Sequence, residues 1–107
     1  MAVIASGTLT PASSGVEEDI NTNTTVGVQT LFIDTTTLTG AVQLDLTVKM
    51  NALSGGTQVV VDSATYVGVQ AQPGKVSIPR LNQFNITFTI KQTGGTLRAF
   101  PWRTETP

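Results

Sequence analysis

The sequence predicts an all-β protein, an antiparallel β-sandwich arranged as a jelly roll of about eight strands. Two long segments alternate apolar and polar residues with a period of two, the pattern of a half-buried antiparallel strand. Turns rich in Gly, Pro, Asn and Ser recur at spacings of roughly ten to fifteen residues, as in sandwiches and barrels. No helix is predicted, and no repeat of fixed period indicates a solenoid.

The two alternating segments are predicted to be the core strands. In residues 42–51, the apolar members of the alternation are Val42, Leu44, Leu46, Val48 and Met50. A helical period also fits part of this set, but the β-branched and Thr content favours a strand. In residues 84–91, the corresponding apolar members are Phe84, Ile86, Phe88 and Ile90.

Turn signals bound the remaining strands. The predicted strands are residues 3–10, 16–20, 26–34, 42–51, 59–69, 76–78, 84–92 and 96–103. Ser54-Gly55-Gly56 and Thr93-Gly94-Gly95 each predict a hairpin between the strands that flank them. Pro79 and Pro101 cannot donate ladder hydrogen bonds, so we expect them at strand ends, bulges or sheet edges.

The length predicts a single domain over residues 1–107, because a chain of 107 residues supplies one hydrophobic core and no more. No stretch has the length and composition of a linker. Residues 1–10 are apolar and interrupted by Gly and Ser, and they form either the first strand or an N-terminal arm that swaps onto a neighbouring copy.

Composition excludes several classes of function. The chain has no Cys and no His, which removes disulfides, thiolate metal sites, Cys nucleophiles and the commonest acid-base group near neutral pH. The net charge of -1 argues against nucleic-acid binding. No signal peptide or membrane-spanning run is predicted, so we expect no membrane partner and synthesis in the cytoplasm.

Charge is distributed unevenly along the chain. All charged side chains in residues 1–48 are acidic, whereas all six Lys and Arg residues lie from Lys49 onward. If the two parts form different faces, the acidic side of one copy can meet the basic side of another. If their strands interleave in the fold, the charges mix instead.

Glu17, Glu18 and Asp19 form one acidic cluster, the first candidate interface. Their spacing matches no calcium loop with defined ligand positions, so no metal is predicted. The cluster is either a solvated acidic patch or a surface that faces a basic partner.

The segment 97–103 combines aromatic and basic side chains, the types enriched at interface hot spots. The candidate interface residues in the basic part of the chain are Arg80, Arg98, Phe100, Trp102 and Arg103. Alternatively, Phe100 and Trp102 point inward together and close the core as part of the last strand.

Catalysis is not predicted. Asp34, Asp45 and Asp62 are the carboxylates that a glycosidase reaction would need, but nothing in the pattern brings two of them together. No cofactor or other small-molecule ligand is expected. A face of Thr, Gln and Asn side chains supports a carbohydrate-binding alternative.

The segment 90–103, with the pattern KQT-GG-T-R-FPW, and the upstream segment 66–73 resemble the C-terminal half of small proteins encoded by tailed bacteriophages. The resemblance implies a structural virion protein of the capsid cement or decoration type. Such a protein is made in the host cytoplasm, docks in multiple copies on the major capsid protein at the capsid surface, and self-associates as a dimer or trimer. The alternative is a carbohydrate-binding or host-adhesion module of a phage tail or fibre.

Overall fold

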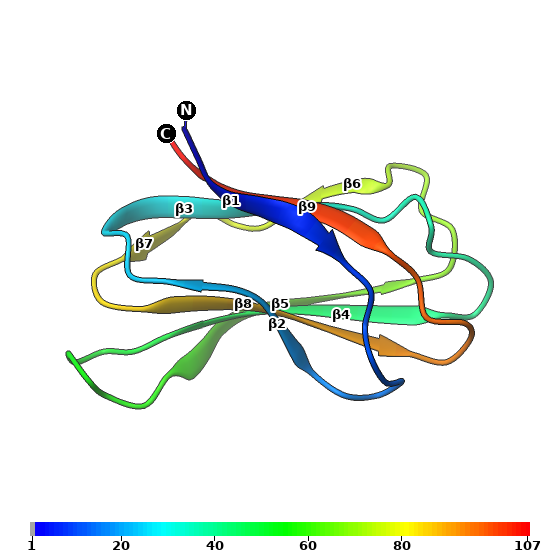
Figure 1. The fold of residues 1–107 in the computed structure, drawn as a ribbon, viewed down its shortest axis with the longest axis horizontal. Helices are drawn as coiled ribbons and strands as arrows, with labels where there is room; N and C mark the ends of the chain where they lie inside the picture. Colours follow the sequence, from blue (N-terminus) through cyan, green and yellow to red (C-terminus); the bar gives the residue numbers. More distant parts are fainter. Residues whose placement is uncertain (1) are drawn as a thin grey trace.

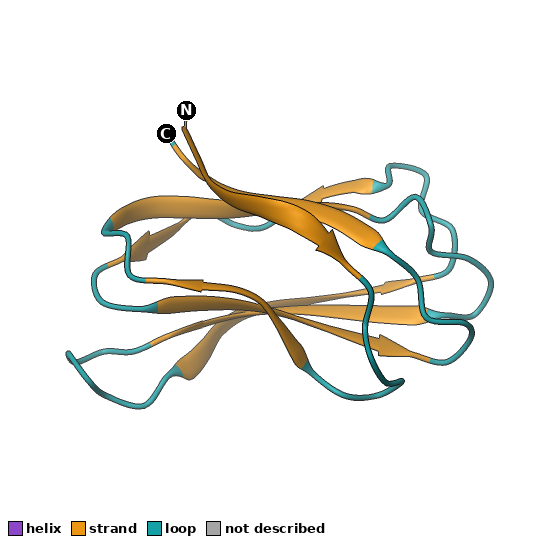
Figure 2. Cartoon of the chain, in the orientation of Figure 1, coloured by secondary structure: helices purple, strands orange, loops and turns teal. Residues whose placement is uncertain are grey.

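A computed structural model describes residues 2–107, which form nine strands in two antiparallel sheets packed face to face (Figure 1). The strands are β1 (Ala2–Leu9), β2 (Glu18–Asn23), β3 (Gly27–Asp34), β4 (Gln43–Met50), β5 (Val59–Val67), β6 (Gly74–Val76), β7 (Arg80–Asn82), β8 (Ile86–Thr93) and β9 (Phe100–Thr106). No described residue is helical (Figure 2). The predicted antiparallel β-sandwich is confirmed.

Sheet A has the strand order β1-β9-β3-β6, and β7 also pairs with β3. Sheet B has the order β2-β8-β4-β5. The chain therefore crosses repeatedly between the sheets, and each sheet contains strands from both halves of the sequence. The charges of the two halves are mixed as a result, as the interleaved alternative predicted. Both termini lie together because β1 pairs with β9 (Figure 1).

Several element boundaries differ from the prediction. The β4–β5 hairpin forms as expected, but the Thr93-Gly94-Gly95 turn joins β8 in sheet B to β9 in sheet A, so the second hairpin prediction is wrong. β7 was not predicted, because three residues carry too little periodicity to be recognised. β2 continues to Asn23 through residues predicted to form a turn, since Asn23 binds the buried Gln29 side chain.

The N-terminal segment forms the first strand in this single chain. β1 pairs with β9 from Ala2↔Thr106 to Leu9↔Phe100, with a register shift between Val3 and Ala5. Met1 lies outside the described residues. Exchange of this segment between copies stays a prediction.

The core lies between the sheets and consists of the inward rows of the central strands. Its buried members are Ile20, Leu31, Ile33, Leu38, Val42, Leu44, Val48, Ile86, Phe88, Ile90 and Phe100. The alternation predicted for β4 is confirmed, although Leu46 and Met50 are only partly buried. The prediction for Phe84 is wrong: β8 begins at Ile86, and Phe84 lies half-buried in the preceding loop.

Two buried amides complete the interior in places where the apolar pattern gives no signal. Gln29 and Asn23 exchange side-chain hydrogen bonds of 2.9 Å in both directions. Gln92 donates to the Thr96 carbonyl at 2.7 Å and accepts from the Arg98 backbone N–H at 3.0 Å. Because buried polar groups without partners are costly, these amides fix the β2–β3 and β8–β9 connections.

Two phenylalanines provide a matched test of this core. Phe88→Ala should lower the free energy of unfolding by about 3–5 kcal/mol, because a fully buried ring leaves a cavity between the sheets. Phe84→Ala removes the same atoms from a half-buried loop position and should cost less than half as much. Equilibrium urea denaturation of both variants measures the difference, and equal losses would contradict the described packing.

Candidate docking faces

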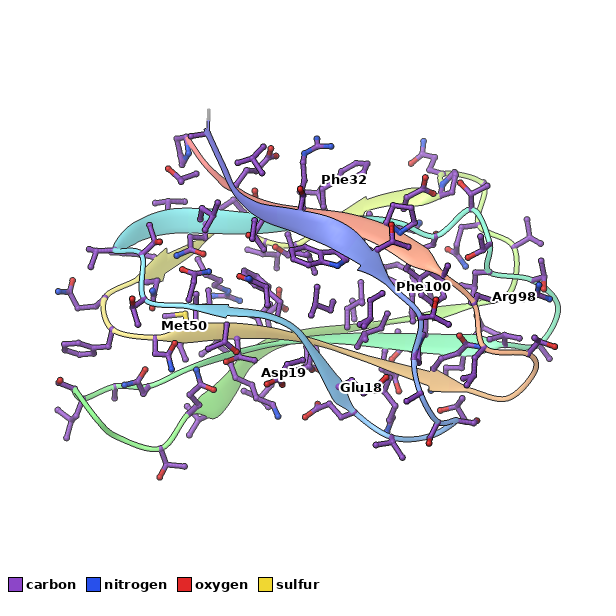
Figure 3. The ribbon with its side chains drawn as sticks, in the orientation of Figure 1. Glu18, Asp19, Phe32, Met50, Arg98 and Phe100 are labelled. Atoms are coloured by element: carbon purple, nitrogen blue, oxygen red, sulfur yellow. The ribbon has the colours of Figure 1, made fainter. Side chains whose placement is uncertain are left out.

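The eight predicted interface residues do not form one site. Glu17 and Asp19 lie with the outer face of sheet B, Arg80 lies at the β5–β7 side, and Arg98 lies in the loop before β9. Figure 3 shows Arg98 at one end of the sandwich, Phe100 between the sheets, and Glu18 and Asp19 at sheet B.

The two aromatic candidates pack toward the interior. This is the alternative in which Phe100 and Trp102 point inward together as part of the last strand. Phe100 is fully buried, and Trp102 packs against the core cluster. Gly7 in the neighbouring strand leaves room for the indole, since a Cβ there would lie 3.3 Å from the Trp102 Cζ2 atom. The Phe100 ring is therefore closed to a partner, and the Trp102 ring is partly buried against the core.

Two of the three acidic candidates bind different partners within the chain. The Glu17 carboxylate binds the Lys49 ammonium group and accepts from the Thr89 hydroxyl, whereas the Glu18 carboxylate accepts from the Ala12 backbone N–H at 2.9 Å. Within residues 2–107, no group of three or more acidic side chains is placed to hold a metal ion.

All three arginines contact other groups of the chain, and two of them lie away from Phe32 and Glu105, the partners of Arg103. The Arg80 guanidinium donates to the Val61 carbonyl at 3.1 Å and lies 3.9 Å from the Asp62 carboxylate. The Arg98 guanidinium donates to the Thr39 hydroxyl at 3.3 Å. Their contacts position the β5–β7 side and the β8–β9 connection.

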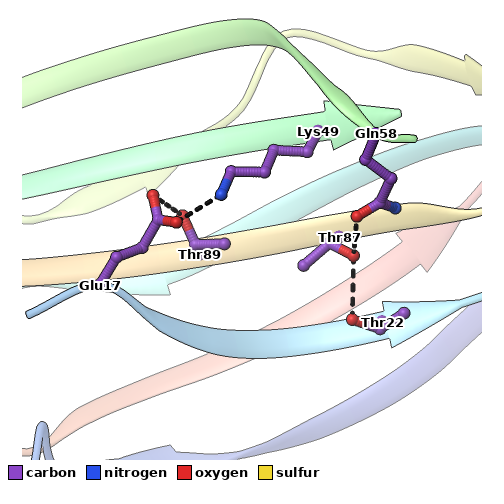
Figure 4. Close-up of polar contacts among 6 residues, drawn as sticks. All are labelled: Glu17, Thr22, Lys49, Gln58, Thr87 and Thr89. Atoms are coloured by element: carbon purple, nitrogen blue, oxygen red, sulfur yellow. Dashed lines mark hydrogen bonds and ion pairs between the residues drawn. The ribbon is translucent and has the colours of Figure 1, made fainter. Parts of the chain in front are cut away.

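The outer face of sheet B is polar, and its side chains bind one another. Gln58 accepts from the Thr87 hydroxyl at 2.9 Å, and the Thr87 and Thr22 hydroxyl oxygens are 3.0 Å apart (Figure 4). Asp45 accepts from Thr65 at 2.7 Å and pairs with Lys91 at 3.8 Å. Most of these polar groups already have a hydrogen-bond or ion-pair partner within the chain, so few of them are free to bind a ligand.

This network lowers the pKa of Glu17 below its ordinary value. The hydrogen bond from Lys49 is the main cause, opposed by partial burial and supported by the Thr89 hydroxyl. Each donor favours the ionised carboxylate. Glu17 therefore stabilises the fold most in its charged form.

The outer face of sheet A is apolar by comparison. Because Leu31 and Ile33 point inward, the outward residues of β3 are Val28, Thr30, Phe32 and Asp34, of which Val28 and Phe32 are apolar (Figure 3 for Phe32). Cross-strand pairing places Val76 beside Phe32 and Leu81 beside Val28. Leu81 and Val76 are 65% and 61% exposed, so they present apolar area directly to the surroundings.

Arg103 continues this face across β9. It pairs with Phe32 in the β3–β9 ladder, and its guanidinium carbon lies 4.3 Å from the centre of the Phe32 ring. Its Nε lies 3.1 Å from a Glu105 carboxylate oxygen. Arg103 is thus the one predicted interface residue that lies on the apolar face. We call the outward residues Val28, Phe32, Val76, Leu81, Arg103 and Glu105 the sheet A face.

Two hollows interrupt the remaining surface. One, with a volume of about 160 Å³, opens between β5 and the β6–β7 segment and is lined by apolar side chains that include Leu46, Val48 and Ile78. At its rim the Lys75 ammonium lies 4.7 Å from the centre of the Tyr66 ring. The other is a shallow polar hollow beside Phe84.

Comparison with protein-family models, curated proteins and solved structures returns no match for this chain. In the described part of the chain, no helix has the length and apolar character needed to cross a membrane.

Neutralising Glu17 tests the sheet B network. Glu17→Gln should lower the free energy of unfolding at pH 7 by about 0.2–1 kcal/mol, since the ion pair lies at the surface and is partly exposed. The folded-state pKa is lowered, so the wild-type advantage exists above the ordinary glutamate pKa of about 4.3 and disappears as pH falls through the folded value.

Urea denaturation of the wild type and the variant from pH 7 to pH 3 measures this convergence. Asp19→Asn is the control, because the Asp19 carboxylate has no hydrogen-bond or ion-pair partner within residues 2–107. A difference between wild type and Glu17→Gln that persists at pH 3 would contradict the assigned cause.

Proposed function

We propose that this chain is a structural virion protein that docks in multiple copies on a phage capsid and stabilises it, as cement and decoration proteins do. The observation that carries the proposal is the contrast between the two outer faces. The central strands of sheet B present a polar network bound to itself, whereas sheet A presents the exposed Val28, Val76 and Leu81 beside the half-buried Phe32. The sheet A face is the docking surface.

The chemistry of this face suits a protein partner. An antiparallel sheet in a sandwich normally turns polar side chains to water, so contiguous outward apolar residues mark an interaction site. Arg103 stacked on Phe32 adds two residue types common at protein interfaces. Glu105 pairs with the Arg103 guanidinium group and would lie at the polar rim of the interface with the partner.

The architecture also supports this assignment. We interpret the strand orders β1-β9-β3-β6 and β2-β8-β4-β5 as those of a jelly roll, in which two four-strand sheets arise from nested Greek keys. Such a sandwich is a stiff block with a face available for docking. Repetition on a symmetric capsid would then convert a modest interface into strong overall attachment.

The carboxylates support a non-catalytic role. Asp45 binds Thr65 and Lys91, Asp62 lies beside Arg80, and Asp34 accepts from the Thr36 backbone N–H at 2.9 Å. The Thr36 hydroxyl also lowers the pKa of Asp34, which keeps this group ionised. Each of these three carboxylates is engaged by a different neighbour, which supports the proposal of a docking protein.

The carbohydrate-binding or host-adhesion alternative has one feature in its favour, the polar hollow around Phe84. Its lining includes the amides of Asn51, Gln83 and Asn85, which can bond hydroxyl groups. The hollow is shallow, and the Thr-rich face of sheet B has its polar groups already bound to one another. We therefore favour capsid docking.

A charge placed on the sheet A face tests the docking surface. Val28→Lys and Val76→Lys should each weaken binding to undecorated phage heads by about tenfold or more, because docking would bury an unpaired ammonium group. Thr93→Lys adds the same charge at the exposed end of β8 in sheet B and should bind as the wild type does. Co-sedimentation over a concentration series measures the affinity.

Two results would count against the proposal in different ways. If both sheet A variants sediment with heads as the wild type does, docking uses another surface. If the wild type leaves heads bare and binds a glycan in an array, the adhesion alternative replaces capsid docking.

A further inference from the structure

The exposed apolar side chains gather at one side of the sandwich. Seven of the twelve exposed large hydrophobic residues among those described lie between residues 59 and 81: Val59, Val60, Val67, Val69, Val76, Ile78 and Leu81. This segment contains β5, the edge of sheet B, and β6 and β7, at the edge of sheet A. The sandwich is therefore open and apolar along its β5 side.

Edge strands expose unpaired backbone N–H and C=O groups. Proteins usually protect such strands with charged side chains, with proline, with a β-bulge or by keeping the strand short. β2 carries Glu18 and Asp19, and β6 and β7 are three residues each and flank Pro79. β5 has nine residues without Lys, Arg or Pro, and its one charged side chain, Asp62, lies beside Arg80. By these criteria β5 is the poorly protected edge of sheet B.

Part of this edge is covered within the chain. The register shift opposite Val48 and Lys49 makes Val61 an extra residue in β5, and Arg80 donates to the Val61 carbonyl at 3.1 Å. This contact protects the first half of the strand. At the other end, the Gln70 amide donates to the Val67 carbonyl at 3.1 Å, and among residues 2–107 no side chain covers the backbone from Ser63 to Tyr66 in this way.

We propose that a second copy of this chain pairs antiparallel with β5 at Ser63–Val67, which joins the two B sheets into one eight-stranded sheet across a twofold axis. Antiparallel pairing places the beginning of one β5 beside the end of the other. With Ser63–Val67 paired with itself, the axis lies at Thr65, and the exposed Val67 of each copy lies opposite Ser63 of its partner.

The charges of β5 permit this self-association. The side chains that face outward beside β4 are Ser63, Thr65 and Val67, opposite Thr47, Asp45 and Gln43 respectively. None of the three is charged, so no like charges meet at the axis. Asp62 is beside Arg80 in each copy, which limits its repulsion across the interface.

The dimer would also cover the cavity of about 160 Å³ between β5 and Ile78, whose mouth lies on the same side. An antiparallel strand pair has its twofold axis perpendicular to the sheet, so both sheet A faces would point to the same side. One dimer would then present two docking faces. The association itself does not depend on what the sheet A face binds.

The absence of Cys makes cross-linking a direct test. Ser63→Cys and Thr65→Cys place a thiol on the outward side of β5 near the expected axis, and Ser6→Cys places one on the other long, uncharged edge strand, β1. Under mild oxidation, at least one β5 variant should form disulfide-linked dimers in severalfold higher yield than Ser6→Cys. Non-reducing electrophoresis measures the yield.

Light scattering of the protein alone gives the second readout. The wild type should have the mass of a dimer at high micromolar concentration, and Thr65→Lys should be a folded monomer, because two ammonium groups would meet at the axis. Ser6→Lys should remain a dimer. A monomeric wild type, or cross-linking through Ser6→Cys rather than through β5, would overturn the inference. Failure here would leave capsid docking intact, since no heads are present in the measurement.

Discussion

The structure depends on burying β8 on both of its faces. Ile86, Phe88 and Ile90 fill the space between the sheets, and on the other side Thr87 and Thr89 are 4% and 1% exposed. Burial of these threonines requires partners for their hydroxyl groups, which Gln58 and Glu17 supply. The central strand of sheet B is therefore held by apolar packing on one side and by hydrogen bonds on the other.

This arrangement makes the two sides of the sandwich unlike each other. The groups that cover β8 are used within the chain, so the outer face of sheet B is polar over β2, β8 and β4, and its exposed apolar side chains, Val60 and Val67, lie on the edge strand β5. Sheet A has no equivalent cover, and Phe32, Val76 and Leu81 stay at its surface. Removing that apolar area from water would favour association, which is why we assign docking to sheet A.

The edges of the sheets suggest how several copies would act together. β1 and β9 bring the termini together at one edge of sheet A, whereas β5 lies at the opposite end of the strand order in sheet B. A dimer through β5 would leave the sheet A faces uncovered. Self-association would then use the β5 edge and docking the sheet A face, which adjoin at Val76, and two faces on one particle would raise attachment through avidity.

Local sequence determined the fold class and the strongest strands, because alternation such as that of β4 reflects one face turned inward. It also indicated Arg103 as an interface candidate, although it grouped this residue with Phe100 and Trp102, which pack inward. Tertiary structure decided the crossing of the Thr93-Gly94-Gly95 turn between sheets, the partners of Gln29 and Gln92, and the contrast between the two outer faces. These features arise from contacts between residues far apart in the chain, and a period of two along one strand does not specify which strand lies beside it.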